Sequence, residues 1–134
     1  MESSEIQVRV RYAETDQMGV VYHGNYAAFF EMGRTEWLRS QGFTYKKLEE
    51  IGVMMPVVSL TMNYKKPAKY DDLLTVKTLL KSQVGVKIEF DYEIYNEQNQ
   101  LLTTGYSMLV FVDMKTGKPV LPPDVILEKI GSKK

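Results

Sequence analysis

One segment of the chain has the apolar periodicity of a helix, while in most other segments apolar and polar residues alternate as they do in β-strands. This contrast limits the folds that the chain can adopt. Over residues 25–41 apolar side chains recur with the helical period, so that one face carries Tyr26, Phe29, Phe30, Gly33 and Trp37. Asn25 is a suitable N-cap, and Gly42 stands where a helix commonly ends. Glycine costs a helix about 1 kcal/mol, so Gly33 predicts a close approach to a sheet, with a merely tolerated glycine as the alternative. The aromatic face is too wide for two flat strands to cover.

The other segments repeat every two residues, as half-buried strands do. Residues 5–12 alternate strictly, with Tyr12 expected on the same face as Ile6, Val8 and Val10. Four more strands are predicted over residues 57–66, 73–82, 86–95 and 101–113, joined in part by hairpin-length loops, and short helices over 45–51 and 124–130. The chain is therefore predicted to be one α+β domain over residues 1–134, with an antiparallel sheet of about five strands wrapped around one long helix.

Composition excludes several classes of function. Seventeen basic and 17 acidic side chains give a formal net charge of zero, so nothing global attracts nucleic acid or an anionic membrane. A neutral chain is also poorly protected against self-association, which makes a homo-oligomer plausible. With no cysteine and one histidine, disulfides, thiol catalysis and the usual zinc sites are excluded, so neither metal nor cofactor is expected.

The same residues indicate where the protein acts. The N-terminus has no basic segment followed by an apolar run, so no signal peptide is expected. No stretch approaches the roughly 20 apolar residues of a membrane span. The expected location is the cytoplasm.

Asp16, His23 and Gly24 stand where the predicted long helix begins. A helix N-terminus carries free backbone N–H groups and partial positive charge, which stabilise an oxyanion when a carbonyl is attacked. A carboxylate beside such donors acts as a general base or a nucleophile, and glycine allows a substrate to approach the backbone. The constellation suits acyl transfer. The alternatives are that Asp16 only forms a turn and that His23 only pairs with polar neighbours.

Two segments carry a resemblance to a known family. R-Y-A-E-T-D-Q-M-G-V-V-Y-H-G-N-Y at 11–26, followed by F-F-E-M-G-R-T-E-W-L-R at 29–39, resembles the 4-hydroxybenzoyl-CoA thioesterase family, and more closely its small bacterial acyl-CoA thioesterases. N-Y-K-K-P-A-K-Y-D-D at 63–72 matches a second family segment. The resemblance implies the hotdog fold, dimers that often pair into tetramers, and an acyl group carried on coenzyme A.

The resemblance also implies roles for particular residues. Asp16 matches the family's catalytic carboxylate, and the family's backbone oxyanion donor falls on His23, whose side chain is also implicated in the subgroup. Tyr12 matches a tyrosine implicated in activity. Gly24 departs from the family, which often has alanine there. The acyl-pocket residues vary too much to be carried over.

Coenzyme A carries negatively charged phosphates, and basic residues are expected to bind them. Lys65, Lys66 and Lys69 form a local basic cluster in a neutral chain, and we expect it to hold the CoA phosphates. A solvated loop is the alternative interpretation. Arg34 and Lys81 are the other candidates.

The sequence therefore predicts an acyl-CoA thioester hydrolase, with the acyl group left open. One alternative is a hotdog protein that binds acyl-CoA without hydrolysing it, although binding needs no carboxylate beside the thioester. Another is a hotdog dehydratase, in which Glu31 would be the acid near His23; the eight-residue offset is too long for that pairing within one chain. A purely structural subunit is the last alternative, and no feature argues for it.

Overall fold

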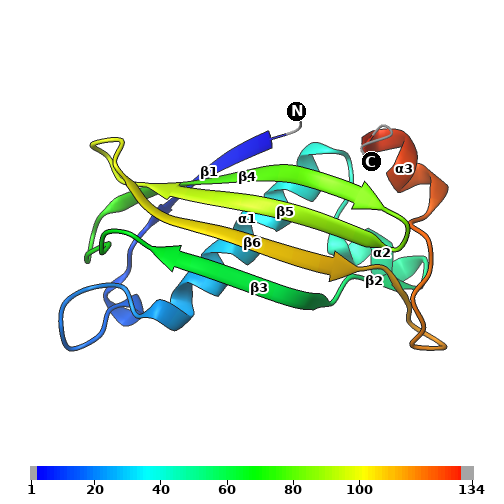
Figure 1. Ribbon diagram of the computed structural model, residues 1–134, viewed down its shortest axis with the longest axis horizontal. Coiled ribbons are helices and arrows are strands. Elements are labelled where there is room, and N and C mark those ends of the chain that lie inside the picture. Colours follow the sequence, from blue (N-terminus) through cyan, green and yellow to red (C-terminus); the bar gives the residue numbers. More distant parts are fainter. Residues whose placement is uncertain (1–2, 131–134) are drawn as a thin grey trace.

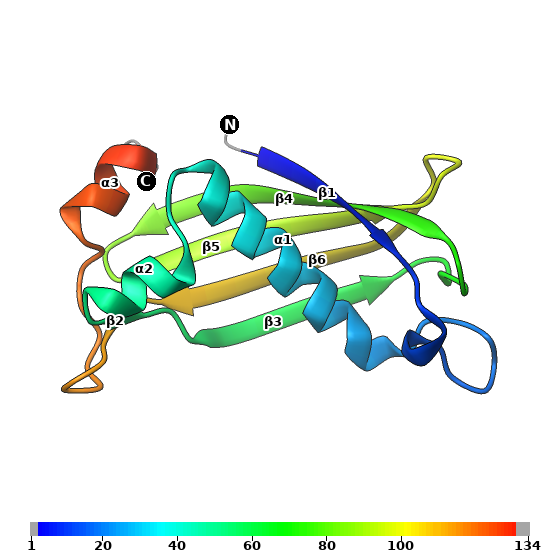
Figure 2. The ribbon, with the colours of Figure 1, turned by 180° about the vertical axis from the view of Figure 1, so that it is seen from behind.

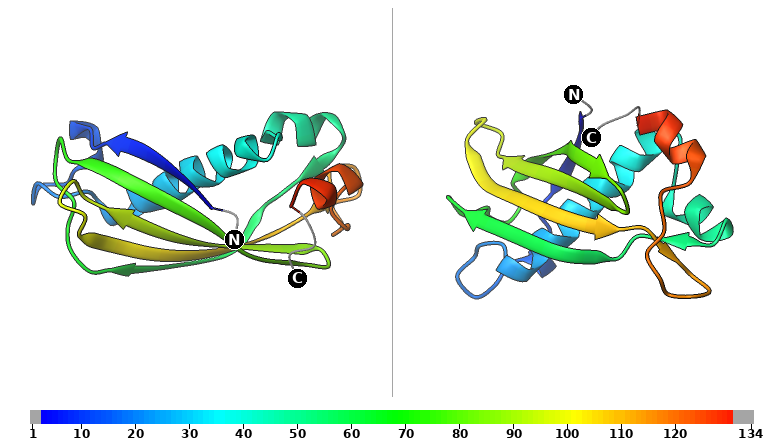
Figure 3. Two further views of the ribbon diagram at one scale, coloured as in Figure 1. Left: turned by 90° about the horizontal axis from the view of Figure 1, so that it is seen from above. Right: turned by 45° about the vertical axis from the view of Figure 1, so that its right-hand side comes forward.

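The computed structural model describes residues 3–130, and its main element is a five-stranded antiparallel sheet crossed by one long helix (Figure 1). The strands lie in the order β1 (Ser3–Arg9), β4 (Leu73–Val84), β5 (Lys87–Tyr95), β6 (Leu101–Val110) and β3 (Val57–Tyr64). The helix, α1 (Tyr26–Ser40), lies diagonally along one face of the sheet (Figure 2). No helix among residues 3–130 covers the other face (Figure 3). This is the hotdog arrangement that the resemblance implies.

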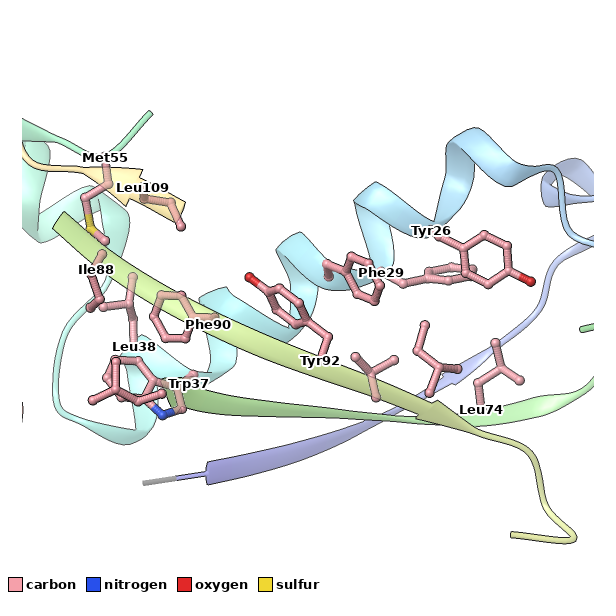
Figure 4. Close-up of a cluster of buried hydrophobic side chains, with 14 of the residues drawn as sticks. Tyr26, Phe29, Trp37, Leu38, Met55, Leu74, Ile88, Phe90, Tyr92 and Leu109 are labelled. Atoms are coloured by element: carbon pink, nitrogen blue, oxygen red, sulfur yellow. The ribbon is translucent and has the colours of Figure 1, made fainter. Parts of the chain in front are cut away.

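The aromatic face of α1 forms the centre of the core, as its helical period predicts. All five of its predicted members are buried: Tyr26, Phe29, Phe30, Gly33 and Trp37. Phe30 stacks on Tyr92 of β5, with ring centroids 4.4 Å apart, and Trp37 meets Phe90 edge to face at 5.0 Å. Figure 4 shows the rings of Trp37, Phe90 and Tyr92 between helix and sheet. Each fully buried side chain of this kind contributes about 1.5–3 kcal/mol.

Gly33 makes the close approach that the sequence predicts. A Cβ built at Gly33 would collide with the hydroxyl of Thr78 on β4. Gly105 on β6 serves the same contact from the sheet, since a Cβ there would meet the ring of Phe30. At both glycines, the backbone of one layer is in contact with a side chain of the other, which brings α1 close to the strands.

Smaller elements connect these parts. Two 3-10 turns, η1 (Tyr12–Glu14) and η2 (His23–Asn25), precede α1. The short helix α2 (Tyr45–Glu50) and the strand pair β2 (Val53–Met54) and β7 (Val112–Asp113) follow at its other end, and α3 (Asp124–Ile130) closes the chain. The β2–β7 pair was not predicted from the sequence. Within residues 3–130 no helix is long and apolar enough to cross a membrane.

Near the start of α1 one local prediction is wrong, and a second holds for the position of the residue only. Tyr12 does not continue the buried face of β1: it is 78% exposed and packs edge-on against Tyr70. The strand ends early because the Glu14 carboxylate accepts hydrogen bonds from the backbone N–H and the guanidinium of Arg11, which folds η1. Asn25 is the N-cap residue, as predicted, but its side chain makes no capping hydrogen bond; its amide donates to the backbone carbonyl of Glu14 at 2.8 Å.

Candidate active site

Asp16 lies at the base of the loop between η1 and η2. Its backbone N–H donates to the carbonyl of Val20, and its carbonyl accepts from the N–H of Gly19, whose positive φ of 79° suits glycine. One carboxylate oxygen, Oδ1, accepts from the N–H of Met18 at 2.8 Å. Asp16 therefore does help to form the turn, as the alternative interpretation of this residue holds. Within residues 3–130 the other oxygen, Oδ2, has no hydrogen-bond partner, so it remains available to a ligand.

The start of the helix presents backbone donors next to this loop. Among the described residues, the N–H groups of His23 and Gly24 have no hydrogen-bond acceptor. Tyr64, the last residue of β3, donates its hydroxyl to the carbonyl of His23 at 3.4 Å. Gly24 makes room for the ring of Tyr22, since a Cβ there would lie 2.8 Å from that ring. In this structure the close approach expected of Gly24 is therefore made by a side chain.

Four of the predicted site residues line a single cavity of about 340 Å³, called here the Asp16 cavity. Its lining includes Asp16, His23, Lys65 and Lys66. Lys69 lies outside it and lines a neighbouring cavity together with Lys66. Tyr12 and Gly24, the two other predicted site residues, are not part of its lining. The chain thus brings the carboxylate, the helix start and two of the three lysines together from segments that are far apart in the sequence.

Two tyrosines of the Asp16 cavity were missed at the level of sequence. Tyr26 and Tyr64 form one wall, with ring centroids 5.3 Å apart. Burial raises the pKa of the Tyr26 phenol, so it stays protonated beside the carboxylate. Tyr64 stands in the N-Y-K-K-P segment that carries the resemblance, which was the available signal. Tyr26 was assigned to the core because the helical period cannot distinguish a core ring from a cavity wall.

The other candidates for the CoA phosphates lie elsewhere. Lys81 extends over the ring of Tyr106 on the sheet face that bears no helix, 5.0 Å from its centroid. Arg34 is buried and bonded to the hydroxyls of Tyr45 and Tyr92. It lines a second cavity of about 490 Å³, called here the Arg34 cavity.

The Arg34 cavity and the Asp16 cavity lie at opposite ends of β3. Val57, the first residue of β3, lines the Arg34 cavity, and Tyr64, the last, lines the Asp16 cavity. Figure 2 shows the same relation: the start of α1 lies by the end of β3, and α2 lies by its beginning. Glu31 lines the Arg34 cavity but not the one that contains His23, which argues against the dehydratase pairing within one chain.

This arrangement suits attack on an acyl group. A carboxylate with one free oxygen can activate water or attack directly, while unpaired N–H groups at a helix start stabilise the oxygen that becomes negative. Two lysines at the same cavity supply positive charge for an anionic carrier.

Comparison with known proteins agrees with this chemistry. A family model described as the thioesterase-like superfamily matches residues 10–130. The putative acyl-CoA thioesterase YneP of Bacillus subtilis is 41% identical over 120 residues, 90% of this chain and 87% of that protein. The acyl-CoA thioester hydrolase YbgC of Escherichia coli O6:H1 is 39% identical over 122 residues, 90% of this chain and 91% of that protein. The crystal structure of DHNA-CoA thioesterase from Staphylococcus aureus superposes with a TM-score of 0.87 at 40% identity, covering 90% of this chain and 81% of that one. Because the family model spans residues 10–130 and the two relatives match over 90% of this chain, the chain belongs to the thioesterase-like superfamily.

Proposed function

We propose that this protein hydrolyses the thioester of an acyl-CoA to the free acid and CoA. One observation carries the proposal: Asp16, with its free carboxylate oxygen, and His23, with its unpaired backbone N–H, line the same cavity as Lys65 and Lys66. Gly24 follows His23 directly and carries a second unpaired N–H. The names of the relatives support the same reaction class. A cytoplasmic location stays a prediction from the sequence.

In the simplest mechanism Asp16 acts as a general base. It takes a proton from water as the water oxygen attacks the thioester carbonyl, and the carbonyl oxygen becomes negative. The N–H groups of His23 and Gly24 stabilise that oxyanion. The carbon–sulfur bond then breaks, CoA leaves as a thiolate, and the proton held by Asp16 returns to its sulfur. Direct attack by Asp16 is the alternative route and passes through a mixed anhydride.

Release of free thiol from a panel of acyl-CoAs tests the proposal. Hydrolysis above the rate without protein supports the enzyme. The competing function is a hotdog protein that only binds acyl-CoA, and binding by calorimetry without thiol release from any member of the panel would establish it.

The lysine cluster is expected to act on substrate affinity. Replacing Lys65, Lys66 and Lys69 with glutamine should raise KM roughly 10-fold or more and leave kcat nearly unchanged, because phosphate contacts bind substrate and transition state alike. Added salt should raise the wild-type KM in the same direction. A matched variant with glutamine at Lys115, Lys118 and Lys129, which are exposed outside both cavities, controls for net charge. An unchanged KM in the first variant would move the phosphate site elsewhere.

The protein is also proposed to form a dimer whose sheet continues through β3. Among residues 3–130 only β6 pairs with this strand, and its other edge is free. Val58 is 56% exposed and Leu60 is 40% exposed along it. A free apolar edge strand readily pairs with another copy of itself. Pairing two such dimers would give the tetramer seen in the family.

Such pairing has a consequence for the site. Two β3 strands related by a two-fold axis at the strand centre run antiparallel, so the beginning of one lies beside the end of the other. The Arg34 cavity of one subunit then adjoins the Asp16 cavity of its partner. Each active site is therefore proposed to contain residues from both chains.

A further inference from the structure

Arg34 is a buried cation whose direct partners are neutral. Its side chain is 7% exposed, Nε donates to the hydroxyl of Tyr45 at 3.3 Å, and Nη1 donates to the hydroxyl of Tyr92 at 3.1 Å. Tyr92 shares a further hydrogen bond with Ser107 at 2.6 Å. No carboxylate of residues 3–130 lies within ion-pair distance of this guanidinium.

The charge on Arg34 cannot be relieved by losing a proton. Burial works to lower its pKa, but the interactions with Tyr92 and Tyr45 outweigh burial and raise the pKa. A buried charge without a partner of opposite sign is costly, and proteins usually provide that partner. No residue among 3–130 provides this negatively charged partner for Arg34, and the Arg34 cavity has space for one.

The walls of the Arg34 cavity suit a short aliphatic chain. Val53, Met55 and Val57 supply apolar surface, and Arg34 is its only basic lining residue. Glu31 and Glu49 also line it, but both are exposed to solvent, where water screens their charge. Glu31 stands three residues before Arg34 on α1, a spacing that permits an ion pair, yet none is formed.

We infer that the Arg34 cavity binds the far end of the acyl group, and that this end is a carboxylate. The preferred substrates are then CoA monothioesters of dicarboxylic acids, with the thioester at the partner's Asp16 and the free carboxylate on Arg34. The inference deepens the proposed function and rests on it and on the dimer through β3. The apolar wall takes the methylene groups, and the guanidinium receives the anion that its own chain does not supply.

The test compares acyl-CoAs that differ only in their far end. Succinyl-, glutaryl- and adipyl-CoA are each paired with the methyl-ended thioester of equal chain length: butyryl-, pentanoyl- and hexanoyl-CoA. Rates are corrected for hydrolysis without protein. At the length that fits, the carboxylate member should have a kcat/KM at least about 10-fold higher, since hydrogen bonds to a charged group are among the stronger ones. Equal or reversed values at every length would overturn the inference.

Variants assign the preference to Arg34. Arg34→Met should abolish it, and Arg34→Lys should retain part of it. Arg39→Met changes an exposed arginine of the same helix and should keep the wild-type ratio. A folded Arg34→Met protein that still prefers the carboxylate member would overturn the assignment. If Arg34→Met fails to fold, the wild-type and Arg34→Lys ratios decide.

The experiment separates this inference from the proposed function. If no member of the panel is hydrolysed, the thioesterase fails, and calorimetric Kd values for the same matched pairs then decide the inference. Equal Kd values at every length would overturn it. If Glu31 supplies the missing negative charge instead, the matched pairs are turned over alike and Glu31→Gln lowers Tm, which also overturns it.

Discussion

Asp16→Asn is expected to lower kcat by roughly 10²–10⁴-fold and to leave Tm nearly unchanged. Asparagine keeps a side-chain oxygen at the position of Oδ1, so the hydrogen bond from the N–H of Met18 persists and the turn is retained. The substitution removes the charge, the basicity and the nucleophilicity of the free oxygen. The measurement is steady-state thiol release together with a thermal melt.

His23→Ala is the matched comparison for Asp16→Asn. The backbone N–H of residue 23 is kept in this variant. If that N–H stabilises the oxyanion, the loss in kcat should be much smaller than for Asp16→Asn. Single-turnover hydrolysis in oxygen-18 water separates the two roles of Asp16. Label in the Asp16 carboxylate indicates an anhydride, and label only in the product acid indicates direct attack by water. An Asp16→Asn enzyme with wild-type turnover would contradict the mechanism but not the fold.

Disrupting the β3 edge is expected to lower activity strongly by preventing dimer formation, with Asp16 unchanged. Lysine at both Val58 and Leu60 places like charges on facing strands, which opposes pairing. A single chain should tolerate the change, because both side chains are exposed in it. The variant should sediment as a monomer, and kcat/KM should fall by roughly 100-fold or more, because the two cavities proposed to form each site would be separated.

Val84→Lys controls for the added charge. This residue is an exposed apolar side chain at the end of β4, on a strand that lies inside the sheet and not at its β3 edge. The control should remain dimeric and active. A wild-type protein that sediments as a monomer at micromolar concentration with full activity would contradict the composite site.

The long helix and the strands were predictable because local periodicity reflects burial directly. The helix face was predicted residue by residue, and the strand at 86–95 differs from β5 by one residue. Gly42 ends α1 with a positive φ of 89°, as its position suggests. The family motif pointed to Asp16 and His23, and a local cluster of basic residues pointed to the lysines; the roles of these residues stay predictions. In each case neighbours in the sequence carry the information, since backbone geometry sets which side chains share a face.

Hydrogen bonds that form only in the folded chain overrode two local patterns. Alternation placed Tyr12 on the buried face of β1, yet the hydrogen bonds of Glu14 to Arg11 end the strand and turn Tyr12 outward. Asn25 stands at the N-cap, where its side-chain oxygen could accept from a helix N–H, but its side-chain amide instead donates to the carbonyl of Glu14, which the loop brings near. Local preference yields when folding supplies a stronger partner.

The cavities show the same division. Their residues come from α1, the loop before it and the segments around β3, which no spacing in the sequence relates. Arg34 was a reasonable phosphate ligand while only its charge was known. Its burial between Tyr45 and Tyr92 removes it from the surface and leaves it without a carboxylate partner among residues 3–130. The sequence by itself determined which groups the protein has for chemistry; the packing of helix on sheet decided which of them meet, because burial and direction depend on neighbours that are remote along the chain.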